Sequence, residues 1–323
     1  MRFFALDTDA SFAHAVAGAG GFALDMHEMR DFGGGEHKGR PLVSVRGQDV
    51  FVLAGLHGDA ELSTNDRLMR ALFFVGACRD HGAASVTAVC PLLPYLRKDR
   101  RTKPLDPLGA RYVAQLFEAV GASAVVTVEA HNPAAFDNAF RIPAVHLDAR
   151  RLFVNHVRER AGDAPFALVS PDIGGFKRVQ RLAESFGEEE RERLTLGLCE
   201  KRRSAGVVSG GFFAGDVKDR PVWILDDMIV GGGTMRRAIR ASLEAGASEL
   251  RLVTTHALFD AEALQDLLDA GAREVVVTDT VAPLGEALTG HAKVEVLSIA
   301  PMLAQCIDRM RLGEPIEQLL SAG

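Results

Sequence analysis

Two acids followed by a glycine-rich turn form the sharpest chemical pattern in the chain. In Val222–Thr234 (VWILDDMIVGGGT), an apolar run ends in Asp226 and Asp227, and the turn Gly231–Thr234 leads into a predicted helix. A glycine turn at a helix N-terminus directs backbone N–H groups at a phosphate. The carboxylates can accept hydrogen bonds from sugar hydroxyls or hold hydrated Mg²⁺. This pattern predicts a sugar-phosphate site; the alternative is a structural turn whose acids cap the helix.

Two basic runs, Arg97–Lys103 (RKDRRTK) and Lys201–Arg203 (KRR), supply cations. Arg and Lys clamp phosphates and stabilise the charge that develops in phosphoryl transfer. The first run lies between an apolar segment and a proline-containing loop, as expected of a mobile loop that closes over a polyphosphate. Taken alone, each run is more typical of a solvated surface.

Polar residues also follow two other apolar runs. His131 comes shortly after Ala124–Val128, and Asp172 after Phe166–Val169. Sheets of α/β proteins bind ligands at the carboxyl ends of their strands, so both residues are candidate ligands of substrate or metal. The alternatives are a histidine at the edge of the core and an aspartate that caps a turn.

The elements that must position these residues alternate along the chain. Short apolar, β-branched runs predict parallel strands buried on both faces, and the segments between them predict helices, so the fold class is α/β. The runs are 50–53, 85–89, 124–128, 166–169, 222–225, 250–253 and 274–277. Helices are predicted over 108–120 and 235–245, each followed by a glycine suited to helix termination, Gly121 and Gly246.

A weak internal repeat indicates two similar halves. Residues 117–128 (FEAVGASAVVTV) and 243–253 (LEAGASELRLV) each combine a helix end, a glycine and a strand. We expect one domain over residues 1–147 and a second over 148–300, and we expect a C-terminal helix within 301–323 to pack back on the first domain.

Amino-acid composition and net charge argue against some classes of function. The chain has 323 residues, with 47% hydrophobic and 25% charged residues and a formal net charge of −6. These values are typical of a soluble globular protein and argue against charge-driven binding to nucleic acid or anionic membranes. The N-terminus does not resemble a signal peptide, and no apolar run is long enough for a membrane span. Four cysteines without a CxxC pair predict buried free thiols, and we expect a cytoplasmic protein.

Five segments, in chain order, resemble the ribose-phosphate pyrophosphokinase (PRPP synthetase) family. They are 44–50, 95–101, 169–175, 200–203 and 224–234, and the resemblance extends over nearly the whole chain. It implies two doubly wound parallel-sheet domains of the type I phosphoribosyltransferase-like fold. It also implies transfer of the β,γ-diphosphoryl group of ATP to the C1 hydroxyl of ribose 5-phosphate, a requirement for Mg²⁺, and a homodimer or hexamer.

The resemblance further implies a role for each matching residue. The catalytic pair is Lys201 and Arg203. The ATP-binding residues are Phe32 and Glu36, which act from a neighbouring subunit, with Arg97, Asp99 and His131. The metal ligands are His131 and Asp172. The ribose 5-phosphate site consists of Asp226, Asp227, Gly231, Gly232, Gly233 and Thr234.

Several positions depart from the family pattern. Its phosphate loop usually reads Asp-Asp-x-x-Asp-Thr-x-Gly-Thr, whereas Val230 and Gly231 replace the third acid and the first threonine here. Its base-binding segment usually reads Phe-x-Asp-x-Glu, and Gly34 replaces that acid. The turn after His131 differs, and the basic loop is a residue shorter. These departures predict a divergent member. Two alternatives stay open: an enzyme of the same fold with changed substrates, and a non-catalytic regulatory subunit, which the retained Lys201 disfavours.

Overall fold

The computed structural model describes residues 1–204, 207–281 and 288–320, apart from the side chains of 200–204, 207–212, 318 and 320. The chain divides into two compact units. The first comprises Met1–Asp148 and a C-terminal segment that starts at Ile299, and the second comprises Ala149–Asp279 and a segment that ends at Ser298.

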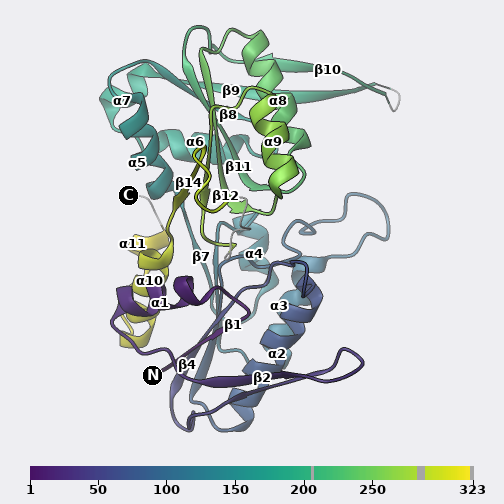
Figure 1. The fold of residues 1–323 in the computed structure, drawn as a ribbon, viewed down its shortest axis with the longest axis vertical. Helices are drawn as coiled ribbons and strands as arrows, with labels where there is room; N and C mark the ends of the chain where they lie inside the picture. The colour runs from purple at the N-terminus through teal and green to yellow at the C-terminus, as the bar shows by residue number, and fades with distance from the viewer. Residues whose placement is uncertain (205–206, 282–287, 321–323) are drawn as a thin grey trace. The chain divides into compact units, whose positions relative to one another are not determined.

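The first unit is a five-stranded parallel sheet in the order β1-β4-β5-β6-β7, with a separate antiparallel hairpin, β2–β3. Helices α2 and α3 cover one face of the sheet, and α1 and α10 cover the other (Figure 1). Its strands are β1 (Arg2–Leu6), β2 (His27–Asp31), β3 (His37–Pro41), β4 (Asp49–Ala54), β5 (Ser85–Cys90), β6 (Ala124–Val128) and β7 (Ala144–Leu147). Its helices are α1 (Ala10–Gly20), α2 (Thr64–Asp80), α3 (Gly109–Ala119), α4 (Pro133–Ala139), α10 (Ala300–Leu312) and α11 (Glu317–Leu320).

The second unit is a seven-stranded sheet in the order β10-β9-β8-β11-β12-β13-β14. All neighbouring strands are parallel except the edge strand β10, which pairs antiparallel with β9. Its strands are β8 (Phe166–Ser170), β9 (Leu194–Ser204), β10 (Val207–Ala214), β11 (Pro221–Ile229), β12 (Glu249–Ala257), β13 (Glu274–Thr278) and β14 (Val294–Leu297). Its helices are α5 (Arg150–Ala161), α6 (Phe176–Glu184), α7 (Glu188–Arg193), α8 (Gly233–Glu244) and α9 (Ala261–Asp269).

Burial on both faces explains the apolar runs. Every residue of β6 and β8 is buried, because helices cover both sides of each sheet. Alternate residues of one strand therefore enter different cores. Phe4 packs with α2, while its neighbour Phe3 lies on the opposite face, and both are fully buried. The predicted α/β class with parallel sheets is confirmed.

Glycine ends the two predicted helices as expected. Helix α3 stops before Gly121 (φ +86°) and α8 before Gly246 (φ +92°), and each glycine N–H donates to a carbonyl of the last helical turn. Two predicted runs are longer in the structure. The run over 222–225 continues as β11 to Ile229 and the run over 250–253 continues as β12 to Ala257, because the two strands pair with each other as far as these residues.

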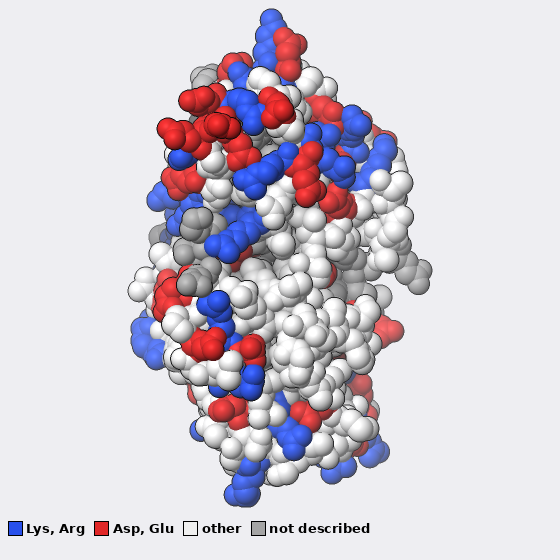
Figure 2. All heavy atoms as spheres, turned by 90° about the vertical axis from the view of Figure 1, so that its left-hand side faces the viewer, with Lys and Arg blue, Asp and Glu red and all other residues white. Residues whose placement is uncertain are grey.

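The surface of the second unit mixes charges of both signs. Figure 2 shows Lys and Arg interleaved with Asp and Glu over α5 and α7, where Arg158 donates to Glu190 at 2.6 Å. Within the described residues, no helix combines the length and apolar character needed to cross a membrane.

Candidate active site

The acid pair lies where β11 extends beyond its neighbour β8. The paired register of β8 and β11 runs to Val169 and Ile224, so Asp226 lies just past the carboxyl end of β8. Asp227 is 2% exposed, and its backbone N–H donates to Asp226 Oδ1 at 2.9 Å. The strand thus holds two carboxylates side by side at the ligand-binding edge of the sheet.

A cation from α6 faces this pair. Arg178 Nη1 lies 3.4 Å from Asp226 Oδ1, and Arg178 Nη2 lies 3.5 Å from Asp227 Oδ1. Burial and the charge of Asp227 raise the pKa of Asp226 to about 8, although Arg178 acts to lower it. One cation does not offset two adjacent carboxylates, so this edge favours a proton or a cationic ligand.

Asp172 shapes the turn between β8 and α6. Its Oδ1 accepts the Gly175 N–H at 3.0 Å, and the Ser170 hydroxyl donates to the Asp172 carbonyl at 2.6 Å. A Cβ at Gly175 would lie 2.9 Å from Ser170 Oγ and 3.3 Å from Arg178 Nη1, so this close approach requires glycine. The turn places Arg178 in the first turn of α6.

The glycine turn joins β11 to α8. Gly232 is the N-cap of α8 and has φ +65°, while a Cβ at Gly231 would meet open space. Thr234 lies in the first helical turn, where its hydroxyl accepts Arg237 Nη2 at 3.1 Å. Helix α8 has 12 residues, so its dipole and first N–H groups favour an anion at this turn.

The predicted catalytic pair lies on β9. The backbone around Lys201 and Arg203 belongs to this strand and pairs with β10, but both side chains lie outside the described residues.

Two predicted ATP-side segments meet in the first unit. Asn132 Nδ2 donates to Asp99 Oδ2 at 2.7 Å, which joins the basic loop to the residue after His131. The exposed Arg97 lies in this loop, whose later part is organised by Asp106, which accepts the Thr102 and Lys103 N–H groups.

The hairpin β2–β3 carries the other two predicted ATP contacts. The Phe32 N–H donates to the Glu36 carbonyl at 2.8 Å and closes the turn, and the Phe32 side chain is 42% exposed. Glu36 lines a cavity of about 670 Å³ whose far wall on α2 includes Met69 and Phe73.

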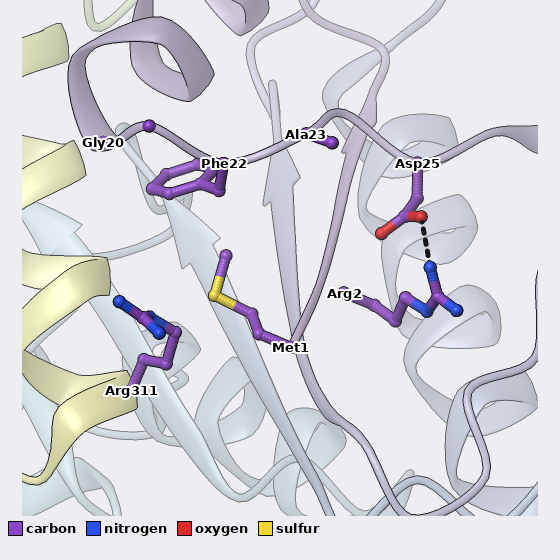
Figure 3. Close-up of a pocket in the computed structure, with 8 residues that line it drawn as sticks. Met1, Arg2, Gly20, Phe22, Ala23, Asp25 and Arg311 are labelled. Atoms are coloured by element: carbon purple, nitrogen blue, oxygen red, sulfur yellow. Dashed lines mark hydrogen bonds and ion pairs between the residues drawn. The ribbon is translucent and has the colours of Figure 1, made fainter.

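A second, smaller cavity of about 210 Å³ lies between α1, β1 and α10 (Figure 3). Arg2 donates to Asp25 at 2.9 Å on one side of it, and Arg311 on the other side pairs with Asp308. None of the residues singled out by the sequence lines it.

One other cluster has metal-ligand chemistry, among the residues whose side chains are described. His156, Glu274 and Glu295 converge near the amino ends of β13 and β14, away from the acid pair. Arg160 donates to both carboxylates, at 3.2 and 2.7 Å, and Arg251 donates to Glu274 at 3.3 Å, so both carboxylates already have cationic partners.

Both units match families of known proteins. Residues 1–121 match the N-terminal domain of ribose phosphate pyrophosphokinase, and residues 136–287 match the phosphoribosyl transferase domain. Ribose-phosphate pyrophosphokinase 2 of Schizosaccharomyces pombe is 31% identical over 99% of this chain and 97% of its own length. The ribose-phosphate pyrophosphokinase of Hyphomonas neptunium is 32% identical over 99% of both chains.

The chain belongs to the ribose-phosphate pyrophosphokinase family. The crystal structure of phosphoribosylpyrophosphate synthetase from Mycobacterium smegmatis superposes with a TM-score of 0.87 at 33% identity, covering 97% of this chain and 99% of that one. The predicted family, the phosphoribosyltransferase-like fold and the assignment as an enzyme are therefore confirmed.

The ribose-phosphate pyrophosphokinase fold also brings in residues that sequence reasoning missed. Arg178 contacts the acid pair, and Arg237 contacts the glycine turn. Arg178 lies in the first turn of α6 and Arg237 just after the first turn of α8, each in a helix that follows a strand-end loop, and that position was the available signal. Asp172 lies near enough to Asp226 for its charge to raise the pKa of that acid, so carboxylate oxygens gather at this edge of the sheet.

Proposed function

We propose that the chain transfers the β,γ-diphosphoryl group of ATP to the C1 hydroxyl of ribose 5-phosphate, giving 5-phosphoribosyl 1-diphosphate and AMP. One observation carries the proposal: two acids at the end of β11 lead through a glycine turn into α8, so carboxylates and phosphate-binding N–H groups lie within a few residues. This spacing suits a sugar phosphate, with its hydroxyls on Asp226 and Asp227 and its 5-phosphate on Gly231–Thr234.

The reaction needs alignment and charge neutralisation more than a covalent intermediate. The C1 hydroxyl oxygen forms a bond to the β-phosphorus, the α–β phosphoanhydride bond breaks, AMP departs, and the hydroxyl proton passes to solvent. Lys201, Arg203 and Arg97 offset the negative charge that builds on the transferred group. Asp226 and Asp227 orient the sugar so that its C1 hydroxyl faces the nucleotide.

We assign Mg²⁺ to His131 and Asp172, and the oxygen-rich neighbourhood of Asp172 supports a hard cation. When bound, Mg²⁺ would neutralise ATP phosphate oxygens. The nucleotide base is assigned to Phe32 and Glu36 of a neighbouring subunit in a homodimer or hexamer. The buried free thiols are compatible with a reducing cytoplasm.

The test is ³¹P NMR of the purified protein with ATP, Mg²⁺ and ribose 5-phosphate. AMP and a sugar diphosphate should appear at equal rates. Lys201→Ala should lower turnover by about 10²- to 10³-fold, as expected when a group that stabilises transition-state charge is lost. Lys293→Ala, at an exposed position of the second unit, is the control and should leave turnover unchanged.

Intact ATP in the presence of a protein that binds it would reject the proposed reaction. Turnover with another pentose phosphate would then identify an enzyme with changed substrates. Ligand-induced thermal stabilisation without turnover on any of them would identify a regulatory subunit.

A further inference from the structure

The phosphate turn of this chain lacks two polar groups that its family usually has. Val230 stands where the family has an acid, and this uncharged side chain is 47% exposed. Gly231 stands where the family has a threonine, and a Cβ there would meet nothing within 4 Å. The turn therefore has one negative charge and one hydroxyl fewer than the family pattern, and open space beside its backbone.

Arg237 lies against the same turn. Its Nη2 donates to Thr234 Oγ1 at 3.1 Å, and its Nη1 lies 3.8 Å from the position that a Cβ on Gly233 would take. The guanidinium therefore contacts Thr234 and lies beside Gly233, at the N-terminal end of α8. A guanidinium has five donors, so the bond to Thr234 leaves donors for a further acceptor.

The neighbouring arginines on α8 are placed differently. Arg236 pairs with Asp266 of α9, which directs its charge away from the turn. Arg240, exposed like Arg237, lies about one helical turn further along and donates no hydrogen bond to the turn among the described residues. Position on the helix, and not the presence of arginine alone, therefore distinguishes Arg237.

We propose that Arg237 is a specificity-determining residue that binds the 5-phosphate of the sugar and supplies a hydrogen-bond donor in place of the hydroxyl absent at Gly231. This inference rests on the proposed function, since it assigns the same turn to the same ligand. Arginine recognises phosphate through paired, charge-assisted hydrogen bonds. With the acid gone and a guanidinium beside the turn, the site favours a phosphate dianion over an uncharged sugar end.

The test compares Arg237→Gln and Arg237→Lys with Arg240→Gln as the matched control on the same helix. Arg237→Gln should raise KM for ribose 5-phosphate about tenfold, the loss expected for one charge-assisted hydrogen bond at an exposed position. Its kcat should stay within about twofold and its KM for ATP should not change, because the contact is to a non-reacting part of the sugar. Arg237→Lys should recover part of the loss, since it keeps the charge without the paired donors. Arg240→Gln should match the wild type.

Direct calorimetric titration with ribose 5-phosphate separates this inference from the proposed function. If no diphosphoryl transfer occurs, but the wild type binds ribose 5-phosphate about tenfold more tightly than Arg237→Gln, the inference holds and the proposed reaction fails. If turnover occurs, but Arg237→Gln has wild-type KM and Kd, the inference is overturned and the proposed reaction stands. No binding of ribose 5-phosphate by the wild type, or equal losses in Arg237→Gln and Arg240→Gln, also overturns the inference.

Discussion

At the scale of residues, Asp226 lies in a charge arrangement that favours a ligand but destabilises the folded state. Its carboxyl lies beside Asp227, and the side chains of Asp226 and Asp227 are 20% and 3% exposed. Arg178 contacts each acid but carries one positive charge against two negative ones. Burial and the charge of Asp227 therefore raise the pKa of Asp226 to about 8, so the folded protein favours a proton on this acid.

This raised pKa predicts a pH dependence of stability. Between the ordinary value of 3.8 and about 8, the folded protein holds a proton that the unfolded chain has released. The folded state therefore binds more protons in this range, and the free energy of unfolding falls as pH rises through it. Asp226→Asn should remove this fall and stabilise the protein by about 1–3 kcal/mol at pH 8.5 relative to wild type.

Urea unfolding at pH 6 and pH 8.5 measures this difference. Asp163→Asn is a suitable control, because the Asp163 side chain is fully exposed. Equal pH slopes for Asp226→Asn and wild type would show that Asp226 is ionised in the folded protein.

At the scale of elements, Arg70 and a stacked ring pair connect the hairpin β2–β3 to α2, and this connection is called the hairpin tie. Arg70 on α2 donates to Asp7 at 2.9 Å and to Asp31 at the end of β2, and His37 on β3 stacks on Phe73 of α2 with ring centroids 5.3 Å apart. Arg70 is 7% exposed, so its charge depends on these two carboxylates. The tie orients the turn that carries Phe32 and Glu36.

Loosening this tie should weaken ATP binding without unfolding the chain. Asp31 is 64% exposed, so Asp31→Asn should cost less than about 1 kcal/mol of stability. It should raise KM for ATP about three- to tenfold, because an unanchored turn loses entropy on binding. Steady-state kinetics and thermal unfolding of the same variant measure both effects.

Glu28→Gln is the matched control. Glu28 pairs with Arg40 across the hairpin itself and not with α2. The Glu28→Gln variant should have the same KM for ATP as the wild type. An unchanged KM in Asp31→Asn would mean that this tie does not orient the ATP contacts.

At the scale of the whole molecule, the cysteines report the integrity of both units. Cys78, Cys90, Cys199 and Cys306 are free and buried, and burial raises the pKa of each thiol to about 12. Thiolate is the reactive form, so at pH 8 only about one thiol in 10⁴ is ionised.

Native protein should therefore react negligibly with Ellman's reagent within minutes, whereas denatured protein should release colour equivalent to all four thiols. Because the reagent reaches buried sulfur only through opening of the structure, the slow native rate should follow the unfolding equilibrium across denaturant. Rapid reaction of any cysteine in the native protein would contradict this expectation.

The sequence by itself determined the features that depend on near neighbours along the chain. Apolar runs predicted the parallel strands, because a strand covered on both faces needs apolar residues at nearly every position. Gly121 and Gly246 predicted helix ends, because a left-handed backbone conformation suits glycine. The acid pair and the glycine turn were visible for the same reason, since they are adjacent in the chain.

Only the tertiary structure decided what depends on residues distant in sequence. Arg178 meets Asp226 across 48 positions, and Arg70 meets Asp31 across 39, and no local pattern encodes either contact. Pairing with β12 extended β11 through the acids to Ile229, where the apolar run alone had stopped. The raised pKa of Asp226 likewise results from burial and from charges brought together by folding, because electrostatic energies depend on distance and surrounding polarity and not on order along the chain.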